Sequence, residues 1–274
     1  MRIGGSVMKP YSSPKEWLSI VRELGYGAVI FPVDSSADAG TRQAYLRCAQ
    51  DNDLVIGEVG VWRNVMDRDP AQREAHIGYA IRQLELAEEV GARCCVTIAG
   101  AWSPLWDGYD PGHGTRAFYD GVVETTQRII DAVKPQKTSF TLEPMPWMCP
   151  ESPEEYLQLL REVDRSAFGV HLDFANMISS LPRYRGASGF ISRCFELLGP
   201  QIRSIHAKDL MIDDTVLPLC IREVPPGQGS IDLALALRLA AQLEGDVPVF
   251  VEHLDSHEAY MAASAHMRAL AAQL

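Results

Sequence analysis

Acidic and histidine side chains end four successive apolar segments in the second half of the sequence. These segments end Thr-Leu-Glu143, His-Leu-Asp173, Ser-Ile-His206 and Phe-Val-Glu252. Carboxylates that are buried together repel one another and are costly to keep charged unless a cation balances them. Carboxylate oxygens combined with one imidazole suit a divalent ion. The pattern therefore predicts one divalent metal ion bound by Glu143, Asp173, His206 and Glu252.

The expected ion is Mn²⁺, and Mg²⁺, Co²⁺, Zn²⁺ and Fe²⁺ are the alternatives for the same donors. The absence of thiolates from this set argues against a structural zinc site. The cysteines have no Cys-x-x-Cys spacing and lie in apolar runs; they are Cys48, Cys94, Cys95, Cys149, Cys194 and Cys220. Such cysteines are typical of core residues in a reducing compartment. The first residues also lack the long apolar run of a signal peptide or membrane span, so we expect a cytoplasmic protein without a membrane partner.

For the four side chains to meet, the segments that carry them must be neighbouring parallel strands. Short β-branched runs predict strands at 3–8, 28–31, 55–61, 95–98, 140–143, 169–173, 204–206 and 249–252. Helical patterns lie between them, at 14–25, 41–51, 70–90, 115–133, from 153, at 190–198, at 231–243 and from 256. This alternation predicts an α/β protein, a single (β/α)₈ TIM barrel domain over residues 1–274. In such barrels the active site lies at the carboxyl ends of the strands, where the four ligands are expected.

A doubly wound open sheet is the structural alternative. That fold usually has a glycine-rich turn after its first strand, whereas Gly4 and Gly5 lie within the predicted strand itself. No linker or low-complexity segment divides the chain, so one barrel is the better interpretation. The net charge of −11 argues against a nucleic-acid partner, because phosphate backbones are bound by basic patches.

Several strings around the predicted ligands are similar to those of one known family. They are Leu-Glu143-Pro, Gly-Val-His-Leu-Asp173-Phe-Ala-Asn176, Ser-Ile-His206-Ala-Lys208-Asp209, Val-Pro-Pro-Gly227-Gln-Gly229-Ser-Ile-Asp232 and Val-Glu252-His-Leu. With them the sequence resembles the xylose-isomerase-like TIM barrels, which include sugar isomerases, ketose 3-epimerases, inosose dehydratase and endonuclease-IV-like proteins. The resemblance implies that Glu143 and Glu252 are both metal ligands and the acid/base pair. They would exchange a proton beside a carbonyl through an enediolate stabilised by the ion.

The resemblance implies a metal-dependent isomerase or epimerase of a small sugar or keto-sugar, acting in carbohydrate metabolism. A lyase of the same family, either inosose dehydratase-like or eliminating from a 3-keto-glycoside, is the first alternative. A non-catalytic barrel subunit stabilised by its metal is the second. Free-ketose 3-epimerases carry a histidine and an arginine where this chain has Asn176 and Ile212, which argues against a free ketose. Relatives form dimers or tetramers, so a homo-oligomer is also a candidate.

Further side chains are candidates for substrate binding. Lys208 could reach a substrate oxygen or pair with Asp209 or a rim carboxylate, and Asn176 could bind a hydroxyl or cap a loop. Glu58 ends the third strand and Trp62 follows it; Glu58 could contact substrate or form a buried salt bridge.

Aromatic residues of the loops after the fourth and fifth strands could form a platform for a sugar ring. They are Trp102, Trp106, His113 and Trp147. Stiffening of these loops or a subunit interface is the alternative for them. His171 and His253 are expected to face away from the adjacent ligands, as packing histidines.

Overall fold

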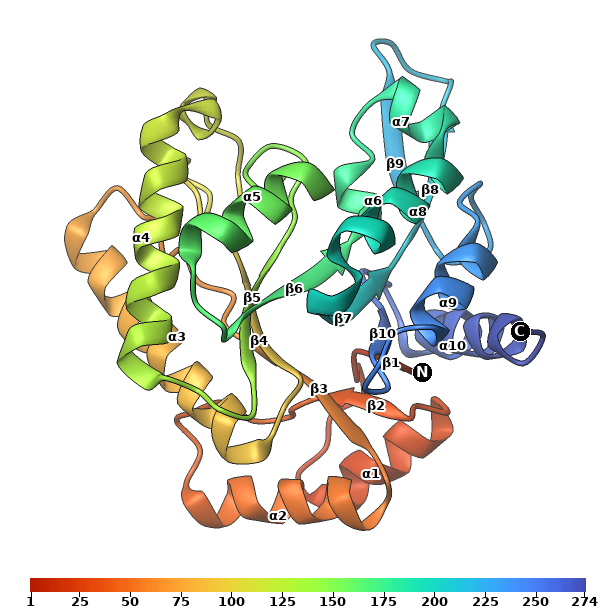
Figure 1. Cartoon of the computed structure of the whole chain (residues 1–274). Helices are drawn as coiled ribbons and strands as arrows, with labels where there is room; N and C mark the ends of the chain where they lie inside the picture. Colours follow the sequence, from red (N-terminus) through yellow and green to blue (C-terminus); the bar gives the residue numbers. More distant parts are fainter.

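Eight parallel strands form one sheet that curls into a nearly closed barrel, which confirms the predicted (β/α)₈ fold (Figure 1). The computed structural model describes residues 1–274. The strands are β1 (Arg2–Gly5), β2 (Ala28–Ile30), β3 (Val55–Gly60), β4 (Cys94–Ile98), β5 (Ser139–Glu143), β6 (Phe168–Asp173), β7 (Ile202–Ala207) and β10 (Pro248–Val251). Their order around the barrel is β1-β10-β7-β6-β5-β4-β3-β2. Between β1 and β2, where no ladder forms, the amide of Gly27 donates to the carbonyl oxygen of Ile3 over 2.9 Å.

A helix follows each strand and covers the outside of the barrel (Figure 1). These helices are α1 (Pro14–Glu23), α2 (Ala39–Asp51), α3 (Pro70–Val90), α4 (Arg116–Val133), α5 (Pro153–Val163), α8 (Ala187–Leu198), α9 (Leu233–Ala241) and α10 (His257–Ala271). Most start at a residue whose side-chain oxygen accepts a hydrogen bond from the first turn. The caps are Ser13, Asp38, Asp69, Thr115, Ser152, Asp232 and Ser256. None of the helices combines the length and apolar character needed to span a bilayer.

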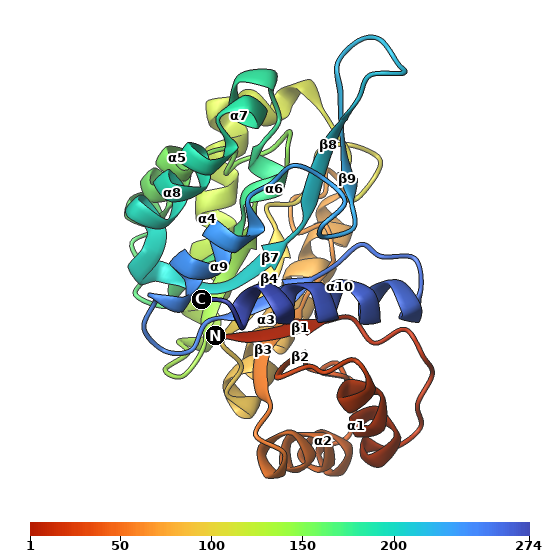
Figure 2. The ribbon, with the colours of Figure 1, turned by 90° about the vertical axis from the view of Figure 1, so that its right-hand side faces the viewer.

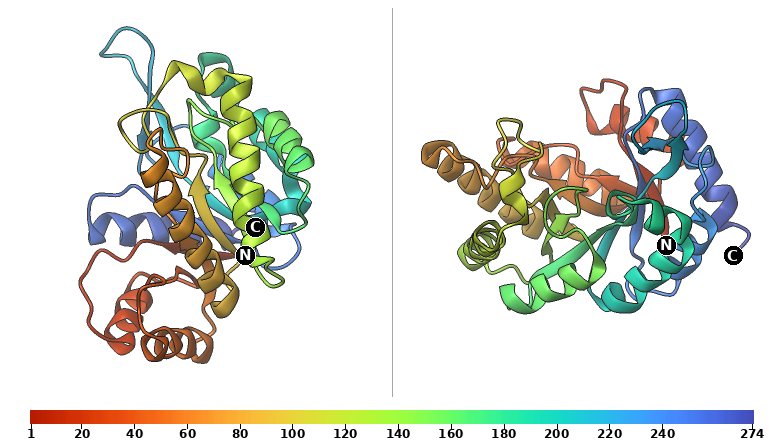
Figure 3. Two further views of the ribbon diagram at one scale, coloured as in Figure 1. Left: turned by 90° about the vertical axis from the view of Figure 1, so that its left-hand side faces the viewer. Right: turned by 90° about the horizontal axis from the view of Figure 1, so that it is seen from above.

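Short elements that the sequence patterns did not predict complete the carboxyl ends of the strands and their connections. They are η1 (Pro111–Gly114), α6 (Phe174–Met177), α7 (Leu181–Arg185), η2 (Gly199–Gln201), β8 (Asp209–Asp213) and β9 (Cys220–Val224). β8 and β9 pair antiparallel as a hairpin that projects beyond the rest of the molecule (Figures 2 and 3). The tip of this hairpin carries Leu217, which is 96% exposed.

Asp209 holds the base of the hairpin through four backbone amides. Its Oδ2 accepts from Gly227 at 3.0 Å and from Gly229 at 2.9 Å. Its Oδ1 accepts from Leu210 and Ile231, both at 2.9 Å. A Cβ atom at Gly229 would lie 2.3 Å from Asp209 Oδ1, so a side chain there would displace the carboxylate. The Pro-Gly-x-Gly string therefore serves to wrap the chain around Asp209.

Inside the barrel, Phe250 of β10 reaches across to β1 and β3. A Cβ atom at either Gly4 or Gly57 would lie 2.5 Å from its buried ring, so these two glycines make room for it. Glu252 is two residues further along the chain, which directs it to the same side but nearer the rim. The bulky apolar layer thus lies below the polar groups of the site.

Candidate metal centre and active site

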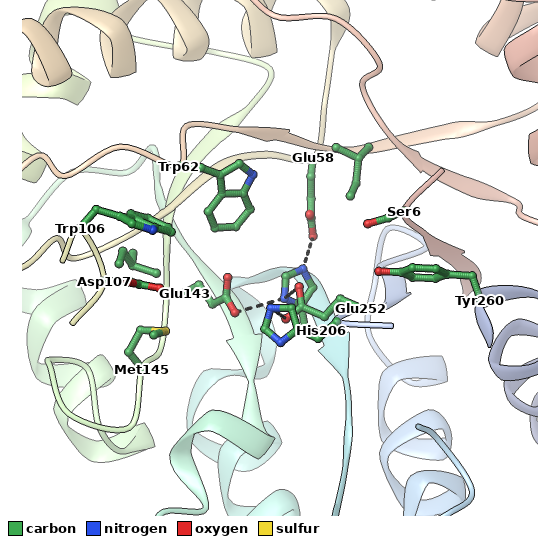
Figure 4. Close-up of a pocket in the computed structure, with 13 residues that line it drawn as sticks. Ser6, Glu58, Trp62, Trp106, Asp107, Glu143, Met145, His206, Glu252 and Tyr260 are labelled. Carbon is green, nitrogen blue, oxygen red and sulfur yellow. Dashed lines mark hydrogen bonds and ion pairs between the residues drawn. The ribbon is translucent and has the colours of Figure 1, made fainter. Parts of the chain in front are cut away.

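The four predicted ligand residues meet at the carboxyl ends of β5, β6, β7 and β10. Glu143, His206 and Glu252 are seen together in Figure 4. Their ligand atoms all lie within 4.8 Å of one another. His206 Nδ1 lies 2.9 Å from Glu252 Oε2 and 3.3 Å from Glu143 Oε1. The same atom lies 3.8 Å from Asp173 Oδ2. The structure therefore brings together a group of donors that could hold one metal ion.

The charges of this group fit a divalent cation. Lys208 is fully buried, and its ammonium lies 2.7 Å from Asp173 Oδ2, 3.6 Å from Glu143 Oε1 and in contact with Glu252 Oε1. Although the ammonium is close, neither Asp173 Oδ2 nor Glu252 Oε1 forms a hydrogen bond of good geometry. Three carboxylates beside one ammonium carry an excess of two negative charges when His206 is neutral. A divalent ion would balance that excess and suits oxygen donors with one imidazole.

The carboxylates also determine the proton affinities of the group. Burial lowers the pKa of His206, but the charges of Glu252, Glu143 and Glu58 outweigh burial and raise that pKa well above its ordinary value. Burial and the charge of Glu252 raise the pKa of Glu143. Burial alone would raise the pKa of Glu252 as well, but the neighbouring His206 and Lys208 hold it below its ordinary value. The two glutamates at one site thus have pKa values shifted in opposite directions.

Asn176 and Lys208, both predicted substrate contacts, connect the carboxylates to one another. Asn176 Nδ2 donates to Glu143 Oε1 at 3.2 Å, and Lys208 donates to Asn176 Oδ1 at 3.2 Å. The backbone amide of Asn176 donates to Asp173 Oδ1 at 2.8 Å, because Asp173 caps the short helix α6. Of the alternatives for Lys208, the structure shows pairing with the rim carboxylates rather than with Asp209.

Glu58 and His171 lie in the barrel interior beneath the four ligands. Glu58 Oε1 lies 3.4 Å from His206 Nε2 and 3.5 Å from His171 Nε2, and it accepts a hydrogen bond from Ser204 Oγ. The prediction that His171 faces away from Asp173 is wrong, since residues two apart in a strand share a face. The His171 ring packs edge-on against that of His206, with 4.0 Å between centroids.

A cavity of about 340 Å³ opens above these groups. Its lining includes Glu58, Glu143, His206 and Glu252 at the floor, and the walls are formed by Ser6, Ile30, Trp62, Ile98, Trp106, Asp107, Met145, His253 and Tyr260. Trp62 and Trp106 lie on one side of the cavity, opposite Ser6 and Tyr260 (Figure 4). Both indoles are partly exposed, at 37% and 40%, which leaves their faces available to a bound ring.

Trp102, His113 and Trp147 do not line this cavity; they join the loops after β4 and β5. His113 is buried, accepts from the amide of Trp102 at 2.9 Å and lies 3.2 Å from the carbonyl oxygen of Trp147. Trp147 Nε1 donates to the carbonyl oxygen of Asp107 at 2.9 Å. These contacts hold the loop that carries Trp106, as in the loop-stiffening alternative.

The sequence patterns missed part of the cavity wall. Ser6 follows β1 and Ile30 ends β2. The predicted first strand ran on to residue 8, so Ser6 was not recognised as a polar residue at a strand end. Tyr260 comes from α10 and has no local signal, because its place at the site depends on how that helix packs.

His253 also differs from its prediction as a packing residue that faces away from Glu252. Its side chain is 60% exposed, and its Nε2 lies 3.3 Å from Glu252 Oε1. The strand ends at Val251, and His253 has a left-handed backbone with φ of 55°, so strand alternation no longer applies there. His253 Nδ1 lies 3.0 Å from Glu223 Oε2 of β9, which ties the hairpin to the site.

The sequence model of the xylose isomerase-like TIM barrel family matches residues 18–270. No curated protein sequence matches the chain. Among solved structures, a xylose isomerase-like TIM barrel protein from Mycobacterium smegmatis in complex with magnesium has a TM-score of 0.70 at 20% identity, over 95% of this chain and 90% of that one.

Two other structural neighbours are enzymes of different reaction types. The 3-keto-D-glucoside 4-epimerase from E. coli has a TM-score of 0.68 at 16% identity, over 98% of this chain and 99% of that one. A probable 3-DHS dehydratase from Bacillus anthracis has a TM-score of 0.71 at 17% identity, over 95% of this chain and 94% of that one. At these identities the neighbours establish the shared fold, and the family match covers most of the chain. The chain belongs to the xylose isomerase-like TIM barrel family.

Proposed function

We propose that this protein is a metal-dependent isomerase or epimerase of a sugar or keto-sugar, moving a proton at a carbon next to a carbonyl. The observation that carries the proposal is the convergence of Glu143 and Glu252 on the floor of the cavity, on either side of His206 Nδ1. A structural neighbour that is a keto-glucoside epimerase supports the same chemistry.

Glu143, Asp173, His206 and Glu252 would hold the divalent ion, with Mn²⁺ as the expected species. When bound, such an ion supplies Lewis acidity, which makes the hydrogen beside a substrate carbonyl easier to remove.

The residues of the chain perform the proton transfer. Glu252, as an ionised carboxylate on the cavity floor, can accept the proton from the substrate carbon. Glu143, as the other member of the pair, can return a proton to the substrate. Asn176 orients Glu143 through its 3.2 Å hydrogen bond, and the ammonium of Lys208 offsets part of the negative charge of the carboxylates. The indoles of Trp62 and Trp106 would pack against the apolar face of a sugar ring and exclude water.

A lyase is the second candidate. The cavity of about 340 Å³ and its two indoles leave space for a substituent beyond one sugar ring, and one structural neighbour is a probable dehydratase. Removal of the same proton would then be followed by loss of a leaving group.

A panel of sugars and keto-sugars incubated with Mn²⁺ in deuterium oxide tests the proposal. One deuterium should enter the substrate carbon without loss of mass elsewhere, whereas release of water or an aglycone would indicate the lyase. Glu252→Gln should reduce the rate by about 10²- to 10⁴-fold, the usual contribution of a general base. The surface change Glu162→Gln is the matched control and should leave the rate unaltered. No exchange on any panel member with the metal-loaded protein would contradict the proposal.

A further inference from the structure

The two nitrogens of His206 face different partners on opposite sides of its ring. Nδ1 faces the rim, where Glu252 and Glu143 lie within 3.3 Å. Nε2 faces the barrel interior, where Glu58 Oε1 lies 3.4 Å away (Figure 4). Glu58 comes from β3, which is not adjacent to β7 in the sheet, so the contact crosses the barrel.

Glu58 is an unusual residue for this position, because it is only 1% exposed and has no lysine or arginine beside it. Its contacts are His206, His171 and the hydroxyl of Ser204. Its second oxygen, Oε2, has no hydrogen-bond partner. Burying a carboxylate with so few partners is costly to the stability of the fold, which suggests that it is kept for the site above it.

We propose that Glu58 is a positioning residue for the metal centre. Glu58 Oε1 accepts a hydrogen bond from Nε2 of His206, which selects the neutral tautomer with its lone pair on Nδ1. That lone pair then faces the place where the three carboxylates would hold the ion. A carboxylate behind a ligand histidine fixes the ring and raises its basicity. The inference rests on the metal-binding part of the proposed function.

Two other roles for Glu58 are consistent with its contacts. Glu58 could act on His171 instead, since His171 Nε2 lies 3.5 Å from the same oxygen. Alternatively, Glu58, His171 and His206 could themselves bind a second ion, because their ligand atoms also lie within 4.8 Å of one another. The first alternative leaves the ring of His206 unaffected by Glu58, and the second requires two ions per chain.

The experiment measures Zn²⁺ binding by calorimetry and the His206 tautomer by long-range ¹H–¹⁵N NMR of the Zn²⁺-loaded protein. The wild type should bind one ion per chain, with the proton of His206 on Nε2. Glu58→Gln should weaken binding by about 10- to 100-fold and shift the Nε2 proton signal. Ser204→Ala is the matched control, since it removes another partner of the same oxygen but leaves the carboxylate behind His206, and should change affinity much less than Glu58→Gln does.

Three outcomes would overturn the inference: Zn²⁺ affinity of Glu58→Gln equal to wild type, a proton on Nδ1 of His206 in the loaded wild type, or a second ion that Glu58→Gln loses. The tautomer is read from the wild type, so the inference is tested even if the variant fails to fold. A wild type that binds no divalent ion would instead overturn the proposed function. Absence of turnover in a metal-loaded protein would leave the role of Glu58 intact.

Discussion

The hydroxyl of Tyr156 donates a hydrogen bond to the carbonyl oxygen of Leu142 at 2.7 Å, immediately before the predicted ligand Glu143. The same hydroxyl lies 3.3 Å from the amide of His171, two residues before Asp173. The pairing of β5 with β6 ends at Leu142. Beyond that point the hydroxyl of Tyr156, from α5, supplies hydrogen bonds to both strands in place of the ladder. It thereby supports the backbone next to two predicted metal ligands, Glu143 and Asp173.

Tyr156→Phe should lower the free energy of unfolding by about 2 kcal/mol, because buried backbone groups lose their partner. It should also weaken metal binding, since Glu143 and Asp173 lose their common support. Chemical denaturation and calorimetry measure the two effects. Tyr119→Phe is the matched control, because the buried hydroxyl of Tyr119 has no hydrogen-bond partner. Equal stability of the two variants would show that the Tyr156 hydroxyl is not a support.

Lys208→Met should increase affinity for a divalent ion by about tenfold or more, because a buried positive charge no longer opposes the ion. In chelator the same variant should lose about 3 kcal/mol of unfolding free energy, since the carboxylates lose their counter-charge. Titration with Mn²⁺ and denaturant melts measure both, with the exposed Lys137→Met as control. Weaker metal binding by Lys208→Met would mean that the ammonium chiefly holds the ligands in position.

Asp209→Asn should destabilise the β8–β9 hairpin, because the amide group of asparagine cannot accept from all four backbone N–H groups. A loss of about 3 kcal/mol is expected, with faster hydrogen exchange concentrated at Leu210 and Gly229. Asp213 lies at the far end of the same strand and accepts only from Thr215. Asp213→Asn is therefore the control and should change stability and hydrogen exchange little. Unaltered exchange at the hairpin base in Asp209→Asn would disprove the anchoring role.

Burial, together with the charge of His206, lowers the pKa of His171 to about 4. In the unfolded chain this imidazole binds a proton near pH 6.5, whereas the folded protein keeps it neutral down to about pH 4. The free energy of unfolding is therefore unaffected by His171 above pH 6.5 and falls as the pH drops from 6.5 to 4. The free energy of unfolding of the wild type should fall by about 3 kcal/mol more than that of His171→Gln over that range. Denaturant melts at several pH values test this, and parallel curves would show that His171 is protonated in the fold.

Removal of the divalent ion should destabilise the protein reversibly. Ion at about a hundredfold excess over its dissociation constant should add about 2.7 kcal/mol to the free energy of unfolding. Thermal melts with chelator and after readdition of Mn²⁺ measure this gain, which Asp173→Asn should reduce. Identical melts with and without ion, at saturating concentrations, would be the contradictory result.

The fold and the four candidate ligands could be predicted because the signals were local. Each ligand follows an apolar strand, and parallel strands place their carboxyl ends at one rim. The hairpin was missed because β8 and β9 are short, half-exposed strands with weak apolar patterns. Its long-range determinant, Asp209, binds amides about twenty residues away, which no local window contains.

Side-chain direction was less predictable than strand position. The left-handed backbone of His253 turns its imidazole back toward Glu252. Histidine is enriched in that conformation, but most histidines do not adopt it, so the residue type alone does not predict it. The contact between Glu58 and His206 depends on two strands that are not adjacent in the barrel. Such relationships arise from closure of the whole sheet.

The two indoles that line the cavity and the four predicted metal ligands come from different halves of the chain. Trp62 and Trp106 come from the first half, whereas the predicted ligands Glu143, Asp173, His206 and Glu252 come from the second, as do the wall residues Met145, His253 and Tyr260. Substitutions in the early loops can therefore reshape the wall while the later strand ends keep their chemistry. Because the two sets of residues can be substituted independently, substrate preference could change while the predicted metal ligands stay the same.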